Sequence, residues 1–514
     1  MRKHLRITVL LIVGLFTVIS AAEEKQYSIS KEFTATNIRT LDFQYSDISI
    51  EEISHNGETF HRISAGENGT ISDVGMPNLP VISTFMMIDP TKTYDVDITI
   101  HETETRYDVN IIPVQDWDNP DIQSEQTLLL NENIYNSNGA FPMSPVSLSD
   151  PMTLRDIHVQ QLSFTPFQYK PQSGELTIIK SATINLIETG QSTDPHFTPA
   201  KVAKEFEPLY RAVVANYDQT MGVEIEYQKP SILYIYPSSG TGVLDNLEPL
   251  IEWRRRAGYD VTVVSTSVTG TSSSSIKSYI QTAYTTWDIP PIWVSLVGDA
   301  GGSYSIPTFY ETWSYNGEGD QPYTELEGGD ILPEVFIGRI SISSSTDLIN
   351  IVNKTVQYET NPYMGENWFT RAVLVGDPGS SGISTVISNQ YIAQLLANNG
   401  YDDLREVYNS PFPSQMTSNL ADGATFFNYR GYYGVSGFDC GDVGAANNGF
   451  KLPIATVITC GTGSFGSGTS ISECFLRAGT VSNPKGAIGS IGTATLGTHT
   501  MFNNIVDMGF YYGV

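Results

Sequence analysis

Residues 453–463 read Pro-Ile-Ala-Thr-Val-Ile-Thr-Cys-Gly-Thr-Gly, an apolar run that ends at a cysteine and a glycine-rich turn. A short apolar run of this kind is typical of a strand buried on both faces of a parallel sheet. In open α/β folds, ligands bind beyond the carboxyl ends of such strands. We therefore expect Cys460 to lie at the edge of the sheet where chemistry takes place.

The same succession of strand and helix extends through the second half of the chain. Strands are predicted near residues 232–236, 261–264, 292–297, 372–375, 424–429, 454–459 and 487–491, and helices near residues 244–251, 273–287, 346–358 and 385–397. This alternation predicts a parallel sheet with helices on both faces. The segments that follow the strands should share one edge; they are Asp299, Asp377, residues 428–434, residues 460–463 and residues 495–499.

The first half of the chain has a different period. Between residues 25 and 225, apolar and polar residues alternate in short runs, as in residues 94–100, and Asn-Gly and Ser-Gly pairs separate the runs. A period of two with frequent turns predicts a mainly antiparallel β module, a sandwich. We place this module at residues 23–225 and the α/β domain at residues 226–514.

Both ends of the sequence carry signals of their own. Basic residues, the apolar run 7–19 and the small residues 20–22 follow one another in the order of a secretory signal peptide, with cleavage expected near Ala22. An N-terminal membrane anchor is the alternative, but a spanning helix needs about 20 apolar residues. We expect an exported mature protein without a membrane span. Residues 510–514 are mostly apolar, so we expect the α/β domain to be incomplete at its C-terminus.

Composition limits the possible partners. The 514 residues include 28 Lys and Arg against 56 Asp and Glu, for a net charge of −28. Nucleic-acid binding depends on clustered basic charge, so we expect no nucleic-acid partner. Three cysteines allow at most one disulfide and leave at least one thiol.

Cys460 is the strongest candidate for a catalytic nucleophile. A thiol that attacks a carbonyl needs backbone N–H groups to stabilise the oxyanion, and a glycine-rich turn supplies them. The alternative is a buried structural cysteine that acts as a small apolar side chain. Cys440 and Cys474 are expected to be inert. Of the seven histidines only His499 lies in the α/β half, so a base for the thiol is scarce.

Several motifs, taken in order, resemble the gingipain-type cysteine peptidases. They are Gly-Met-Pro-Asn-Leu-Pro-Val at residues 75–81, Ser-Phe-Thr-Pro-Phe-Gln-Tyr at 163–169, Leu-Val-Gly-Asp at 296–299, Pro-Glu-Val-Phe-Ile-Gly-Arg-Ile at 333–340, Phe-Asn-Tyr-Arg-Gly at 427–431, and Cys460. The resemblance implies a secreted bacterial enzyme with a β-sandwich propeptide and a caspase-like α/β catalytic domain.

The resemblance also implies a Cys/His dyad, and here the sequence departs from the pattern. The cysteine maps onto Cys460, but the expected Asn-Tyr-x-Gly-His-Gly reads Asn-Tyr-Arg-Gly-Tyr-Tyr-Gly at residues 428–434. Tyr432, or Tyr433 with one insertion, stands where the histidine is expected. A tyrosine is a poor base near neutrality. Either His499 supplies the base from a neighbouring strand end, or the chain is a pseudo-peptidase.

The resemblance implies further residue roles, each from a shorter stretch of sequence. The oxyanion would be held by backbone N–H groups at Cys460 and at Gly431, Tyr433 and Gly461. Residues 319–323 resemble the segment from which arginine-specific members place an acidic residue in the substrate pocket, which maps to Asp320, and Asp299 is a second candidate for substrate binding.

Asp320 also has a different interpretation. It lies among other acidic residues, so a solvated loop or a structural calcium site is the alternative. No cofactor is expected for catalysis.

Our leading hypothesis is a secreted cysteine endopeptidase made as a zymogen. It would act on protein or peptide substrates through a Cys460 thioester. The N-terminal module would inhibit it until the connection between residues 213 and 229, downstream of Arg211, is cut. The alternatives are an inactive surface protein that binds peptides or glycans, and a sortase-like transpeptidase of a secretion system.

Overall fold

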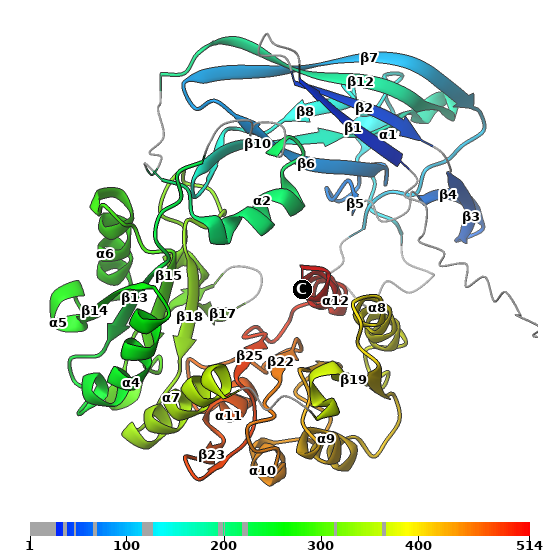
Figure 1. The fold of residues 1–514 in the computed structure, drawn as a ribbon. Coiled ribbons are helices and arrows are strands. Elements are labelled where there is room, and N and C mark those ends of the chain that lie inside the picture. The colour runs from blue at the N-terminus through cyan, green and yellow to red at the C-terminus, as the bar shows by residue number, and fades with distance from the viewer. Residues whose placement is uncertain are drawn as a thin grey trace, which may run out of the picture. The chain divides into compact units, whose positions relative to one another are not determined.

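The computed structural model describes residues 27–33, 39–45, 48–64, 69–115, 127–193, 199, 201–217, 225–312, 316–361 and 366–513 (Figure 1). The predicted signal peptide, residues 1–22, lies outside this set. Within it, no helix has the length and apolar character needed to cross a membrane.

The chain divides into two compact units. The first comprises Met1–Ser83, Asp95–Ser147 and Ser163–Glu188, and the second comprises Thr84–Tyr94, Leu148–Leu162 and Thr189–Val514. Three stretches on the N-terminal side of the predicted boundary at residue 225 therefore belong to the second unit, because several long strands of the β module run through both units. The boundary between residues 225 and 226 stays a prediction.

The N-terminal half consists of antiparallel sheets, as the period of two predicts. One sheet has the order β1 (Tyr27–Phe33), β2 (Arg39–Tyr45), β12 (Glu175–Gln191), β11 (Phe167–Lys170), with β7 (Lys92–Arg106) on β12. The other has the order β5 (Gly69–Thr70), β6 (Pro80–Ile88), β10 (Ile157–Phe164), β8 (Val146–Leu148), with β9 (Met152–Leu154) on β10. The ring of Phe43 on β2 meets that of Phe164 at the end of β10 edge-on at 4.6 Å, so these two strands contact each other through apolar side chains.

Short elements complete this half and connect it to the next. They are the hairpin β3 (Ser49–His55) and β4 (Glu58–Ser64), α1 (Glu132–Tyr135), α2 (Glu207–Val213), and the 3-10 turns Pro171–Ser173 and Lys204–Phe206.

The α/β half begins with a sheet of four parallel strands. Its order is β14 (Asp260–Ser265), β13 (Ser231–Tyr236), β15 (Trp293–Val297), β18 (Phe336–Ile340). Leu233 and Ile235 pack with α6 (Ser273–Thr286), while Ile232 and Tyr234 pack with α4 (Val243–Arg256) and α7 (Ser345–Thr360). Alternate residues of β13 thus enter two different cores, which is why the strand reads as an uninterrupted apolar run.

A second parallel sheet carries the cysteine. Its order is β20 (Asp403–Val407), β19 (Arg371–Gly376), β21 (Phe426–Arg430), β22 (Ile454–Val457), β25 (Gly489–Gly492). α8 (Ser384–Asn398) and α12 (Thr500–Gly513) pack on one face, and α9 (Phe412–Ala421), α10 (Cys440–Ala445) and α11 (Ile471–Arg477) pack on the other. The parallel α/β prediction is confirmed, but the strands form two sheets where the sequence suggested one.

Smaller elements fill the connections of the α/β half. They are α5 (Thr266–Thr269), the pair β16 (Phe309–Glu311) and β17 (Gly317–Gly319), the pair β23 (Gly479–Thr480) and β24 (Asn483–Pro484), and the 3-10 turns Gly302–Tyr304, Gln321–Tyr323 and Asn367–Thr370.

A buried lysine joins the two parallel sheets. Lys354 projects from α7, which covers the first sheet, and its Nζ donates to the carbonyl oxygens of Leu476, Ala478, Lys485 and Ala487, at 2.6, 3.4, 3.1 and 3.2 Å. One of these carbonyls belongs to the last turn of α11, and the other three lie between α11 and β25 of the second sheet. Burial lowers the pKa of Lys354 to about 7. The four backbone acceptors replace part of the hydration that burial removes from this amine.

The segment Leu148–Leu162 places a second buried cation in the second unit. Arg155, in the turn between β9 and β10, donates from Nη1 to the carbonyls of Pro291, at 2.9 Å, and Glu334, at 2.5 Å. Its guanidinium lies 5.2 Å from the ring centre of Phe206. These contacts explain why a piece of the β module belongs with the α/β half.

Candidate active site

Cys460 lies three residues beyond the end of β22, in a turn at the carboxyl edge of the second parallel sheet. It is 8% exposed, and it is the one cysteine outside a disulfide. Its Sγ lies 3.5 Å from the carbonyl oxygen of Thr498, to which it donates. Gly461 has φ of +76°, a conformation that side chains other than glycine rarely adopt. The glycine therefore permits the sharp turn that leaves the sulfur at the sheet edge.

Backbone contacts attach this turn to its neighbours. The N–H groups of Gly461 and Gly463 donate to the carbonyls of Thr495 and Thr493, both at 3.0 Å. The Gly461 N–H therefore already has an acceptor, which argues against its predicted oxyanion role. The carbonyl of Cys460 accepts from Gly434 at 3.1 Å.

The tyrosines in the position of the expected histidine point toward solvent. Tyr432 and Tyr433 are 63% and 64% exposed. Tyr433 forms an isolated parallel bridge with Cys460, and its ring would lie 3.6 Å from a Cβ built on Gly461. Gly431 leaves no room for a side chain, because a Cβ there would collide with the hydroxyl of Tyr429. The structure thus brings Tyr433 and the 431–434 loop to the cysteine.

His499 caps a helix. Its carbonyl accepts from the Phe502 N–H at 3.1 Å, and its Nδ1 accepts from the Met501 N–H at 3.1 Å, at the start of α12. With Nδ1 accepting, the neutral ring carries its proton on Nε2, which then cannot take a proton from a thiol. Among the described residues, the hydrogen-bond partner of the Cys460 sulfur is Thr498 and not His499. The arrangement favours a capping role for His499.

Both carboxylates predicted to bind substrate are occupied by arginines. Asp320 makes a bidentate pair with Arg339, with Nε–Oδ2 and Nη2–Oδ1 distances of 2.8 Å. Asp299 accepts from Nη2 of Arg477 at 2.9 Å. A paired carboxylate has little charge left for a basic substrate side chain, so the geometry argues against this role for either residue. No group of three or more His, Cys, Asp or Glu side chains that could hold a metal occurs among the described residues, and the calcium site stays a prediction.

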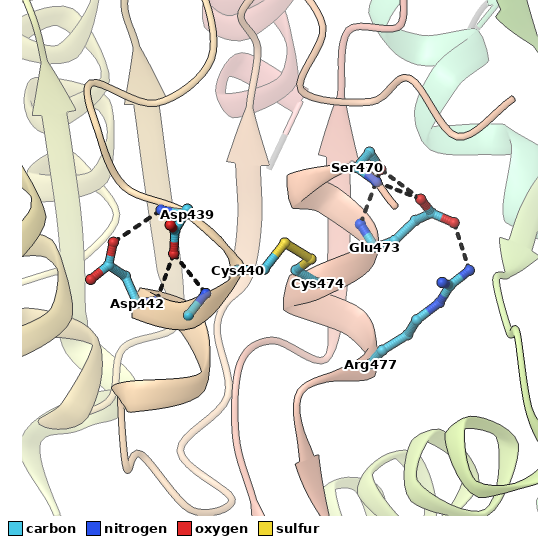
Figure 2. Close-up of a disulfide and its surroundings, with 8 residues drawn as sticks. Asp439, Cys440, Asp442, Ser470, Glu473, Cys474 and Arg477 are labelled. Atoms are coloured by element: carbon cyan, nitrogen blue, oxygen red, sulfur yellow. Dashed lines mark hydrogen bonds and ion pairs between the residues drawn. A yellow bond between two sulfur atoms is a disulfide. The ribbon is translucent and has the colours of Figure 1, made fainter. Parts of the chain in front are cut away.

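A disulfide ties α10 to α11 on one face of the second sheet. Cys440 at the start of α10 bonds to Cys474 in α11, as Figure 2 shows. One bridge and one remaining thiol agree with the limit set by three cysteines. In the same helix, Glu473 accepts from Ser341 Oγ and Arg477 Nη2, both at 2.6 Å. The disulfide and this cluster together hold α11 between the two sheets.

A cavity of about 360 Å³ opens between β18 and β25. Gly463, three residues after Cys460, is one of the residues that line it. The other lining residues include the charged Glu318, Arg339 and Glu473 and the apolar Phe465 and Ile491. Oε1 of Glu318 accepts a hydrogen bond from the N–H of Gly466 at 2.6 Å.

A row of buried polar side chains where α12 packs on the second sheet was not predicted from the sequence. It comprises Asn389, Asn428, Arg430, Thr456, Asn504, Asp507 and Tyr511. Burial raises the pKa of Asp507 to about 7, and hydrogen bonding from Asn428 and the charge of Arg430 oppose this. The available signal was polar residues at alternate positions of two otherwise apolar strands, residues 426–430 and 454–457.

Comparisons with known proteins agree with this architecture. A family model described as Peptidase family C25 matches residues 225–514, and one described as Propeptide_C25 matches residues 29–221. Gingipain R2 of Porphyromonas gingivalis is 25% identical over 488 residues, 90% of this chain and 64% of the relative. Another form of gingipain R2 from this organism is 26% identical over 83% of this chain and 59% of the relative.

Two further likenesses are more distant. Lys-gingipain of Porphyromonas gingivalis is 23% identical over 96% of this chain and 30% of the relative. The crystal structure of the Arg-specific cysteine proteinase gingipain R superimposes with a TM-score of 0.49 at 22% identity, over 55% of this chain and 67% of that one. This chain therefore spans only part of the length of the relatives it matches.

Proposed function

Because the chain belongs to peptidase family C25, we propose that it is a cysteine endopeptidase whose nucleophile is Cys460. The observation that carries the proposal is the position of this thiol, beyond the carboxyl end of a central parallel strand, in a glycine turn beside a cavity. Parallel sheets present reactive groups at this edge.

The proposed reaction has the two steps of a cysteine peptidase, formation of a thioester and its hydrolysis. The Cys460 thiolate attacks the scissile carbonyl carbon, the C–N bond breaks, and the amine leaves with one proton while a thioester forms. Water then attacks the thioester and releases the carboxylic acid, which restores the thiol. Tyr432 would transfer the protons, since Nδ1 of His499 is occupied by the Met501 N–H, and backbone N–H groups at Cys460 and along residues 431–433 would stabilise the oxyanion.

We propose that the N-terminal half acts as a propeptide. The match of residues 29–221 to the propeptide model, directly before the peptidase match, supports this role. Activation would then cut the connection between residues 213 and 229. The order of basic, apolar and small residues in 1–22 supports export to the cell surface or beyond.

The test uses the full chain, before and after limited proteolysis of this connection. A peptide chloromethyl ketone is expected to label Cys460, and a protein substrate such as casein is expected to be cleaved after activation. Cys460→Ala is the control and should abolish both.

Absence of cleavage with intact folding would favour the pseudo-peptidase. The exposed Tyr432 and Tyr433 in place of a histidine are the observation behind that alternative. In that case Cys460 should react no faster than a free thiol, and peptides should bind without being cut.

A further inference from the structure

Tyr433 is attached through its backbone to the residue that carries the proposed nucleophile. It forms a parallel bridge with Cys460, and the N–H of the next residue, Gly434, donates to the carbonyl of Cys460 at 3.1 Å. The side chain of Tyr433 nevertheless remains 64% exposed. An aromatic ring is thus held beside the Cys460 turn with most of its surface open to solvent.

A second apolar side chain, that of Leu496, is attached to the same turn. The carbonyl of Thr495 accepts from the Gly461 N–H at 3.0 Å, and the carbonyl of Thr498 accepts from the Cys460 thiol at 3.5 Å. Leu496 lies between these two acceptors in the chain and is 61% exposed. Two contacts therefore hold an exposed leucine next to the turn.

The two apolar side chains converge at Gly461. A Cβ built on this glycine would lie 3.1 Å from Cδ2 of Leu496 and 3.6 Å from Cε2 of Tyr433. Because the glycine has no side chain of its own, the leucine and the tyrosine ring approach the same point, one residue after Cys460. Together they form a small exposed apolar surface, the Tyr433–Leu496 platform.

This platform favours an apolar ligand group. Covering it with another apolar side chain removes apolar surface from water, which is favourable roughly in proportion to the area covered. A lysine or arginine side chain placed there would lose hydration of its charge without gaining a charged partner from the platform. The ligand group that fits best is therefore uncharged and apolar.

Three carboxylates that follow strands or line the neighbouring cavity already have partners. Asp299 and Asp320 are each paired with an arginine. Asp377, the residue after β19, accepts from the hydroxyl of Ser436 and from the N–H of Gly379. These three groups leave little charge for a basic side chain of a substrate.

We propose that the Tyr433–Leu496 platform binds an apolar side chain of the substrate, that of the residue whose carbonyl Cys460 attacks. This assignment rests on the proposed role of Cys460 as the nucleophile. The thioester keeps this residue bonded to Sγ between the two steps, so its side chain stays close to the turn. The chain thus prefers to cleave after phenylalanine or leucine rather than after lysine or arginine, and Tyr433 and Leu496 determine this specificity.

The experiment compares tosyl-phenylalanyl chloromethyl ketone with tosyl-lysyl chloromethyl ketone on the full chain, before and after limited proteolysis. Cys460 is the one thiol outside the disulfide, and mass spectrometry locates the label. Each labelling rate is divided by the rate with iodoacetamide, which removes differences in the reactivity of the thiol itself. The resulting ratio measures recognition even in a chain that cleaves no peptide. We expect it to be at least about tenfold higher for the phenylalanyl probe.

Four variants test whether the platform causes the preference. Leu496→Ala and Tyr433→Ala should each lower the phenylalanyl ratio by about fivefold or more and leave the lysyl ratio unchanged. Tyr433→Phe keeps the ring and should behave like the wild type, which separates the apolar surface from any role of the hydroxyl. Leu244→Ala, at an exposed leucine of α4, is the control and should change neither ratio. Circular dichroism confirms that each variant is folded.

The proposal is overturned by equal ratios for the two probes, by a higher ratio for the lysyl probe, or by a Cys460 that reacts with neither. It is also overturned if Leu496→Ala and Tyr433→Ala both leave the phenylalanyl ratio unchanged. Failure of the peptidase function gives a different result, in which the phenylalanyl probe still reacts preferentially but casein is not cleaved. Cleavage of casein after lysine or arginine would support the peptidase function and refute the role of the platform.

Discussion

At the scale of single residues, the sequence is most informative where a residue type and a strand end coincide. Cys460 was found because a buried run ends at it, and the structure places it at the sheet edge. Arg430 was not singled out because a charged residue at the end of an apolar run usually marks the return to solvent. Its burial depends on α12, which packs across β21 from far along the chain. No local pattern contains that information.

The first prediction at this scale concerns Asp320. Its side chain and that of Arg339 are 13% and 7% exposed, so Asp320→Asn leaves a mostly buried guanidinium without its charge partner. We expect the free energy of unfolding in urea to fall by about 3 kcal/mol. Glu325→Gln, on the same loop but more exposed, is the control and should change it by less than about 0.5 kcal/mol. An equal effect of the two substitutions would contradict the structural role.

A second residue-scale prediction concerns pH. Burial raises the pKa of Glu334 from 4.5 to about 8. The folded chain therefore holds this proton more tightly than the unfolded chain, so the contribution of Glu334 to stability decreases as the pH rises from about 4.5 to about 8. Glu334→Gln should flatten the pH dependence of unfolding in this window. Parallel curves for the variant and the wild type would show that the group is not buried as a carboxylic acid.

At the scale of secondary structure, the predictions succeeded where one face or both faces of an element are apolar. The helix predicted at residues 273–287 is α6, Ser273–Thr286, with a serine cap. The strand β20, Asp403–Val407, was missed because its residues are mostly charged, and Arg371 pairs with Asp403 at 2.5 Å on this edge strand. The division into two sheets was missed because a strand pattern does not show which strands pair.

An element-scale prediction comes from the disulfide. Cys440 and Cys474 close a loop of 34 residues and tie α10 to α11. Replacing both by serine should lower the free energy of unfolding by about 3 kcal/mol, since the bridge restricts the unfolded chain. Urea denaturation with and without reductant measures this. Reductant should destabilise Cys460→Ser as much as the wild type, and should have no effect on the double serine variant.

At the scale of the whole molecule, the division into a β half and an α/β half was predictable from the change in period. The assignment of Leu148–Leu162 to the second unit was not. It depends on Arg155, whose partners Pro291 and Glu334 are 136 and 179 residues away in the chain. Contacts over such separations leave no local trace in a sequence.

A whole-molecule prediction concerns cleavage of the chain. After a cut between residues 217 and 225, the two fragments should still elute together in size-exclusion chromatography, because the Arg155 turn stays buried in the second unit. Arg155→Met should allow them to separate or should weaken their association at least tenfold. Immediate separation of the wild-type fragments would contradict the prediction.

Lys354 couples the two parallel sheets of the α/β half to each other. The Lys354 amine, on a helix of the first sheet, donates to four carbonyls beside the second sheet, so separating the sheets would leave a buried polar group without its acceptors. The two sheets should exchange their amide hydrogens as one cooperative body. Lys354→Met should split that body into two. In the unmodified chain, the cavity between β18 and β25 should keep its shape, because the two sheets that line it cannot move apart independently.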